Sequence, residues 1–139
     1  MARSCASISP RAGSSPSSPP RISAGTRRLE RWLLPGGHVE RGDPSLEAAA
    51  RREVIEETGA QLDGSPGRIV GMDVHGIPPK KKEPYHQHHD LIFAFRATDV
   101  VVRVSEESRE VRWCEATDEE FRRYALPEPI IRAVRRARA

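Results

Sequence analysis

Three glutamates stand close together between residues 52 and 60, which read REVIEETGA. On an α-helix of 3.6 residues per turn, Glu53, Glu56 and Glu57 project within an arc of roughly 100°. Like charges at these spacings destabilise an isolated helix. A patch of carboxylates of this kind suits a hard divalent cation such as Mg²⁺, whose charge turns the repulsion into attraction. The alternative interpretation is a solvated acidic helix face that binds nothing.

The loop before these glutamates favours the metal-binding interpretation. Residues 35–43 read PGGHVERGD, so two adjacent glycines place backbone amide and carbonyl groups directly before the helix. Gly36, Gly37 and His38 are therefore candidate contacts for a substrate. The loop and the acidic helix together indicate a site for a metal-bound phosphate.

The rest of the chain alternates strand and helix signals around this motif. Asp43 followed by Pro44 predicts a helix start with Asp43 as the N-cap, and Gly59 predicts the helix end. A short apolar run, stopped by Pro35, predicts a strand before the glycines. Further strands are predicted at 68–77, 88–97, 100–104 and 110–116, and an amphipathic closing helix at 126–139. This order predicts a layered α/β or α+β domain.

The motif is similar to the box of the Nudix hydrolases, which reads Gly, five residues, Glu, seven residues, then Arg-Glu-U-x-Glu-Glu-x-Gly-U, where U is a bulky aliphatic residue. Gly37 opens the box, and its second half is filled by Arg52, Glu53, Val54, Glu56, Glu57, Gly59 and Ala60. Three positions depart from the pattern. Asp43 stands in place of the first Glu, eight residues instead of seven separate it from Arg52, and Ala60 is small for an aliphatic position.

The resemblance covers about residues 29–139 and implies a Nudix-type α/β/α sandwich with a mixed β-sheet. It implies hydrolysis of a nucleoside diphosphate linked to another moiety, with Mg²⁺ or Mn²⁺ as cofactor. By the same resemblance, Glu53, Glu56 and Glu57 are metal ligands, the Gly37 carbonyl is a further one, and Arg52 orients a glutamate. A non-catalytic Nudix-type module that binds or senses a nucleotide is the alternative function.

The sequence offers two candidates for the general base. Glu53 on the box helix is the first choice, and Glu107, on a later loop before the VRW sequence, is the second. An intact Arg-Glu-x-x-Glu-Glu set favours an enzyme, because a module that only senses nucleotides could lose these carboxylates.

Residues 1–28 differ in composition from the rest. They are rich in Ser, Pro and Arg and contain no Asp or Glu, which predicts a disordered segment that is dispensable for stability. A misassigned start codon or an organellar transit peptide would also account for this composition. Because nothing in 8–28 resembles a strand, the domain over 29–139 is expected to lack the first strand of its sheet.

A second polar cluster reads HQHHD at residues 86–90. On a strand, His88 and Asp90 point to one side, and they would border the substrate if that side faces the box helix. Together with His75, they are predicted to line a substrate pocket. Solvated or structurally hydrogen-bonded residues and a second metal site are the alternatives.

Composition sets the remaining expectations about partners and location. The basic excess lies in residues 1–28, which hold five of the 23 Lys and Arg, so the remaining residues carry a formal charge of about −2 and no specific nucleic-acid binding is expected. The sequence contains no apolar run long enough to cross a membrane and only two cysteines, without CxxC spacing. The expected setting is the cytoplasm, the expected partner is a small-molecule nucleotide, and a homodimer is one further expectation.

Overall fold

The computed structural model describes residues 2–10, 21–28, 31–99, 101–104, 106 and 110–138. Its larger sheet has four strands in the order β4-β1-β6-β5: β1 (Ala2–Pro10), β4 (Gly36–His38), β5 (Arg68–Ile77) and β6 (His86–Ala97). Strand β1 runs parallel to β6 and antiparallel to β4, while β5 is antiparallel to β6. The sheet is therefore mixed, as the sequence resemblance implied.

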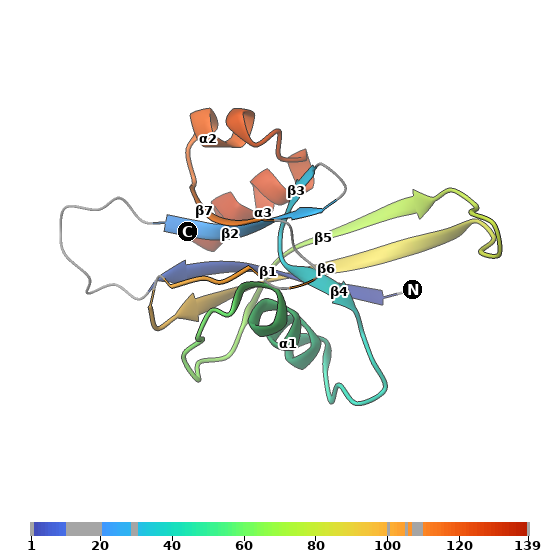
Figure 1. The fold of residues 1–139 in the computed structure, drawn as a ribbon, viewed down its shortest axis with the longest axis horizontal. Coiled ribbons are helices and arrows are strands. Elements are labelled where there is room, and N and C mark those ends of the chain that lie inside the picture. The colour runs from blue at the N-terminus through green and yellow to red at the C-terminus, as the bar shows by residue number, and fades with distance from the viewer. Residues whose placement is uncertain are drawn as a thin grey trace.

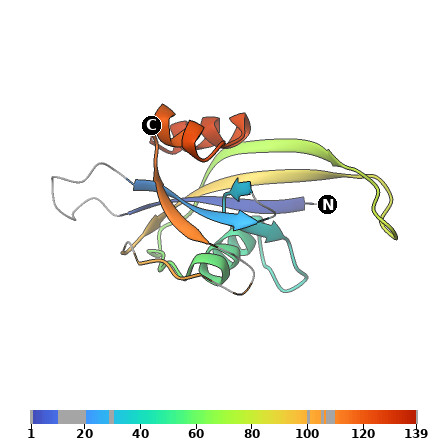
Figure 2. The same ribbon diagram turned by 45° about the horizontal axis from the view of Figure 1, so that its top comes forward.

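A second, antiparallel sheet has the order β3-β2-β7, with β2 (Arg21–Arg28), β3 (Arg31–Leu33) and β7 (Val111–Glu115). Helix α1 (Leu46–Thr58) packs below the sheets, whereas α2 (Asp118–Arg123) and α3 (Glu128–Arg138) lie above them (Figure 1). Figure 2 shows the same three layers from a second direction. No helix within the described ranges has the length and apolar character needed to cross a membrane.

Strand β6 is buried on both faces, and the alternation of its side chains decides which helix each residue meets. Phe93 and Phe95 pack in one cluster with Val54 of α1. Ile92 points the other way and packs with Ala133 of α3. Because successive strand residues alternate between faces, the even-numbered residues of β6 face the α3 side of the sheet and the odd-numbered residues face the α1 side.

The predicted box helix is present, but its N-cap is not the predicted residue. Gly59 ends α1 in the left-handed conformation, with φ of 65°, as the sequence indicated. At the other end, Ser45 is the N-cap, and its hydroxyl accepts a hydrogen bond from the Ala48 amide at 3.0 Å. The prediction of Asp43 as the cap is wrong, because an arginine of the helix holds its carboxylate.

The expectation that residues 1–28 are disordered and that the sheet lacks a strand is wrong for the described parts of this segment. Residues 2–10 form β1, which lies between β4 and β6, and residues 21–28 form β2, which lies between β3 and β7. Residues 11–20 lie outside the described ranges. Composition misled the prediction because a strand inside a sheet is held by backbone hydrogen bonds to both neighbours, and those bonds do not require apolar side chains.

Two other predictions about secondary structure need correction. A strand was predicted at 100–104, but residues 101–104, which the structure describes, do not form one. The Arg103 amide instead donates a hydrogen bond to the Thr58 carbonyl at the end of α1. Helix α2 was not predicted. Its signal is nevertheless in the sequence, because the Thr117 hydroxyl accepts from the Glu120 amide, as in an N-terminal capping box.

Candidate active site

Two of the three box glutamates turn inward and one turns outward. Glu53 is 7% exposed and Glu57 is 1% exposed, whereas the side chain of Glu56 is 56% exposed. Glu53 and Glu57 are four residues apart, so they lie one turn apart on the same helix face. The solvated-face interpretation therefore applies only to Glu56.

The two inward carboxylates lie against the glycines of strand β4. A Cβ atom added at Gly37 would lie 2.6 Å from Glu53 Cδ, a distance that real Cβ atoms do not adopt. The Gly36 amide donates to Glu57 Oε2 at 3.3 Å. A glycine is thus required at position 37, because the helix brings the Glu53 carboxylate so close to the backbone that no side chain fits between them.

The Arg52 guanidinium connects the loop before α1 to the helix, because all three of its nitrogens donate hydrogen bonds. Its Nε and Nη2 donate to Asp43 Oδ1 and Oδ2 at 3.0 and 2.9 Å, a bidentate pair. Its Nη1 donates to Glu53 Oε1 at 3.1 Å and to Glu56 Oε2 at 3.0 Å. A further bond runs from Nη2 to the His38 carbonyl at 3.2 Å. Arg52 therefore connects two box carboxylates to the end of strand β4.

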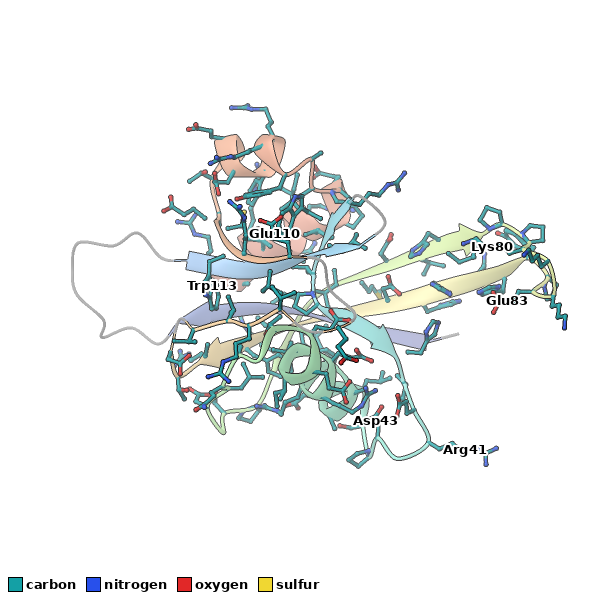
Figure 3. All side chains as sticks on the ribbon, in the orientation of Figure 1. Arg41, Asp43, Lys80, Glu83, Glu110 and Trp113 are labelled. Atoms are coloured by element: carbon teal, nitrogen blue, oxygen red, sulfur yellow. The ribbon has the colours of Figure 1, made fainter. Side chains whose placement is uncertain are left out.

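Asp43 has a clear structural role despite its departure from the box pattern. It lies in the loop beside α1 (Figure 3), and its Oδ2 also accepts the Glu40 amide at 2.8 Å. The hydrogen bonds from Arg52, and then that from the Glu40 amide, lower the pKa of Asp43 from 3.8 to about 2. The same partnership raises the pKa of Arg52 above its ordinary value. The sequence did not indicate this pair, because residues nine apart across a loop and a helix turn share no regular spacing.

The donors around Glu53 have the chemistry that a hard cation needs. Carboxylate and carbonyl oxygens are preferred by Mg²⁺, and Glu53, Glu57 and the Gly37 backbone all lie on one side of α1. Glu56 is beside them, because its carboxylate and that of Glu53 contact the same Arg52 nitrogen. Within the described residues, no three acidic, His or Cys side chains already converge as a metal site. The residues fit Mg²⁺ by type, and Glu56 has the freedom to turn toward it.

The histidine cluster lies on the other face of the sheet. His88 and Asp90 have even positions on β6, so they share the face that carries Ile92 toward α3. His75 faces His88 across the β5–β6 ladder, with ring centroids 5.5 Å apart. These three residues were predicted to border the substrate only if their side of the strand faces the box helix, and that side faces α3 instead. The His38 ring also joins this cluster, 5.1 Å from the His88 ring.

The second candidate for the general base, Glu107, lies outside the described residues. Its neighbour Glu110 is described, and it forms an ion pair with Arg112 (Figure 3). Among the described candidates, Glu53 is the one that contacts both the glycine strand and Arg52.

Comparison with known proteins identifies the family of the chain. Residues 21–134 match the family described as NUDIX domain. The chain belongs to the Nudix family. Its three layers are the Nudix α/β/α sandwich, and β2 lies inside the matched region, so part of the segment predicted to be disordered belongs to the domain.

Two curated Nudix relatives align with about two thirds of the chain. It is 31% identical over 101 residues to the m7GpppN-mRNA hydrolase NUDT17 of Xenopus laevis, covering 68% of this chain and 34% of that protein. It is 33% identical over 94 residues to the probable DHNTP pyrophosphohydrolase of Lactococcus lactis subsp. cremoris, covering 66% of this chain and 55% of that protein. The alignments thus span about a third and about half of these relatives.

A solved structure shows the same fold at low identity. The NUDIX domain of Shewanella oneidensis NrtR, complexed with ADP ribose, superposes with a TM-score of 0.69. It is 15% identical and the match covers 99% of this chain and 86% of that chain. This likeness supports the Nudix architecture.

Proposed function

We propose that this Nudix protein hydrolyses the pyrophosphate bond of a nucleoside diphosphate linked to another moiety. The observation that carries the proposal is the burial of Glu53 and Glu57 against the glycines of β4. Arg52 is the cation that pairs with Glu53, and it is shared with two further carboxylates. Carboxylates gathered in excess beside a glycine strand favour a site for a metal-bound diphosphate over a purely structural role.

The contacts suggest a role for each residue of the site. When bound, Mg²⁺ or Mn²⁺ would supply neutralisation of the diphosphate charge and activation of water. Glu53, Glu56 and Glu57, with the Gly37 carbonyl, are the residues that would hold it. Glu53 is the proposed general base, because it is the described box carboxylate held by Arg52 and also placed against the β4 backbone. Arg52 holds that carboxylate in its orientation.

A cavity lined mainly by residues of β7 and α2 is a candidate site for the nucleoside or leaving group. It has a volume of about 700 Å³, which suits a nucleotide-sized ligand. Its lining includes the aromatic side chains of Trp113 and Tyr124 and the cationic side chain of Arg123. Trp113 also packs against the core cluster of α1, so the cavity adjoins the layer that carries the box.

The relatives suggest substrates that share a chain of phosphates. They include an mRNA cap hydrolase, a probable DHNTP pyrophosphohydrolase and a domain bound to ADP ribose. The ADP ribose complex also motivates the alternative function, a module that binds a nucleotide without turnover. The retained Arg52 and its paired glutamates favour hydrolysis.

A substrate screen with Glu57→Gln as the diagnostic variant tests the proposal. Purified protein with Mg²⁺ or Mn²⁺ would be incubated with nucleoside triphosphates, ADP ribose, dinucleoside polyphosphates and cap analogues, and the products would be resolved by chromatography. At least one compound should be cleaved, and chelation should abolish the cleavage. Glu57→Gln should lower kcat by about 100-fold or more, because an oxygen that contacts the metal is replaced.

The matched control is Glu83→Gln, at the tip of the β5–β6 hairpin far from the box (Figure 3). It should keep the wild-type rate. Wild-type turnover by Glu57→Gln would reject the metal-ligand assignment. Binding of a nucleotide with a measurable Kd, without cleavage of any compound in either metal, would favour the sensing module.

A further inference from the structure

We propose that His75, His86 and His88 bind a divalent transition-metal ion such as Zn²⁺ on the face of the sheet opposite the Nudix box. The three imidazoles come from neighbouring strands: His86 and His88 from β6 and His75 from β5. His86 and His88 are two residues apart, so both project from the same face, and His75 is the cross-strand partner of His88. This site is separate from the carboxylates of α1.

The separation of the His86 and His88 nitrogens is close to that of two ligands sharing an ion. Their Nε2 atoms form a hydrogen bond at 3.1 Å, which a metal ion would replace. Two nitrogens bound tetrahedrally to zinc at about 2.0–2.1 Å are separated by about 3.3 Å. His86 Nδ1 lies 3.0 Å from the Pro84 carbonyl. A proton on Nδ1 satisfies that carbonyl and leaves the Nε2 lone pair available to the metal.

His75 is oriented in a similar way by carboxylates. Its Nδ1 is 3.2 Å from Asp73 Oδ2 and 3.9 Å from Asp90 Oδ2. An imidazole whose Nδ1–H faces a carboxylate presents Nε2 as a more basic ligand, which is the usual outer-shell arrangement in zinc sites. Its ring centroid is 5.5 Å from that of His88, and the His86–His88 separation is 5.0 Å. Rings that share a tetrahedral zinc ion are about 5 Å apart.

Asp90 gives independent support for a cation on this face. Its Oδ1 is buried and has no hydrogen-bond partner among the residues that the structure describes, and its side chain is 12% exposed. A buried carboxylate oxygen without a partner is costly and indicates a water or an ion that would satisfy it. A cation at the imidazoles would offset the charge of Asp90. The His38 ring, whose centroid is 5.1 Å from that of His88, is the candidate for a fourth ligand position.

The three histidines of the proposed site do not converge on one point in the structure, so binding requires the His75 ring to rotate toward the His86–His88 pair. Such a site would link β5 to β6 across their ladder, because His75 is the cross-strand partner of His88. Imidazole ligands favour transition-metal ions such as Zn²⁺ over Mg²⁺, which prefers oxygen ligands. The two sites should therefore differ in the metal they take.

Cobalt spectroscopy tests the site without relying on activity. Co²⁺ would be titrated into the full chain in excess Mg²⁺, which occupies hard oxygen sites, and the intense visible bands of tetrahedral Co²⁺ would be recorded. Wild type should bind one equivalent, and Zn²⁺ should displace it. His86→Ala and His75→Ala should each weaken binding by about 10-fold or more, since one ligand is lost. Circular dichroism would verify that these variants fold.

His89→Ala is the matched control, because His89 lies on the same strand but is exposed on the opposite face. It should bind Co²⁺ like wild type, and so should Glu57→Gln, which keeps this test distinct from that of hydrolysis. Absence of tetrahedral bands in the wild type, bands that persist in both His86→Ala and His75→Ala, or their loss in His89→Ala would each overturn the proposal.

Discussion

The backbone of Gly37 lies directly under the carboxylate of Glu53, so that a Cβ atom at position 37 would be 2.6 Å from Glu53 Cδ. Gly37→Ala should therefore push Glu53 away from its position. A misplacement of about 1 Å can cost about 100-fold in rate, so we expect kcat of the proposed hydrolysis to fall by up to that factor while the fold is kept. Steady-state kinetics and a melting curve measure the two effects.

Gly42→Ala provides the control, because a Cβ atom there would meet no other atom within 4 Å. It should leave kcat unchanged. If Gly37→Ala were as active as Gly42→Ala, the close approach of Gly37 and Glu53 would have no role in catalysis.

Arg52→Lys should be far from conservative. A lysine keeps the charge but cannot form the bidentate contact with Asp43 while also bonding Glu53 and Glu56. We expect kcat to fall by about 10- to 100-fold, as is typical when a group that orients a metal ligand is changed, with a smaller effect on KM. Arg41→Lys, an exposed change in the same loop, should behave as wild type. Equal kinetics for the two variants would show that the bidentate contact of the Arg52 guanidinium is unimportant for catalysis.

The pair of Asp43 and Arg52 predicts a specific loss of stability in acid. The folded pKa of Asp43, about 2, is below its ordinary value of 3.8, so the folded state favours the ionised carboxylate. This stabilisation is complete above pH 3.8 and is lost as the pH falls through about 2. Wild type should thus melt at a higher temperature than Asp43→Asn at about pH 5, and the difference should shrink between about pH 4 and 2. A constant difference across that range would contradict the assigned pKa.

Removal of residues 1–28 should abolish cooperative folding, which reverses the expectation drawn from composition. The deletion takes away β1, one of the two inner strands of the larger sheet, and β2, the middle strand of the smaller sheet. A milder test is Ser4→Pro, because position 4 pairs with Gly37 on one side and Leu91 on the other. Proline removes the amide donor from an inner strand, so we expect a loss of about 1 kcal/mol or more in the free energy of unfolding, measured by denaturant titration.

Val104→Pro is a suitable comparison for the strand variant, since Val104 is 57% exposed and lies outside any strand. It should cost less than Ser4→Pro. An N-terminal deletion that still unfolds cooperatively at the wild-type temperature would show that β1 and β2 contribute nothing to the domain.

The local parts of the site could be predicted from the sequence because they depend on short spacings. The helix, its end at Gly59, the pairing of Arg52 with Glu56 four residues later and the acidic patch all follow from 3.6 residues per turn and from glycine's access to positive φ. The family resemblance of the box rests on the same short-range pattern. These features hold whatever the remainder of the chain does.

Tertiary structure alone decided what those residues face. Helix spacing places Glu53, Glu56 and Glu57 in one arc, but only packing against β4 buries two of them and leaves Glu56 in solvent. Asp43 became the partner of Arg52, and not a helix cap, because the loop folds back onto the helix. Strand β1 and the side taken by His88 depend on pairing between segments about 85 residues apart, which local sequence patterns do not encode.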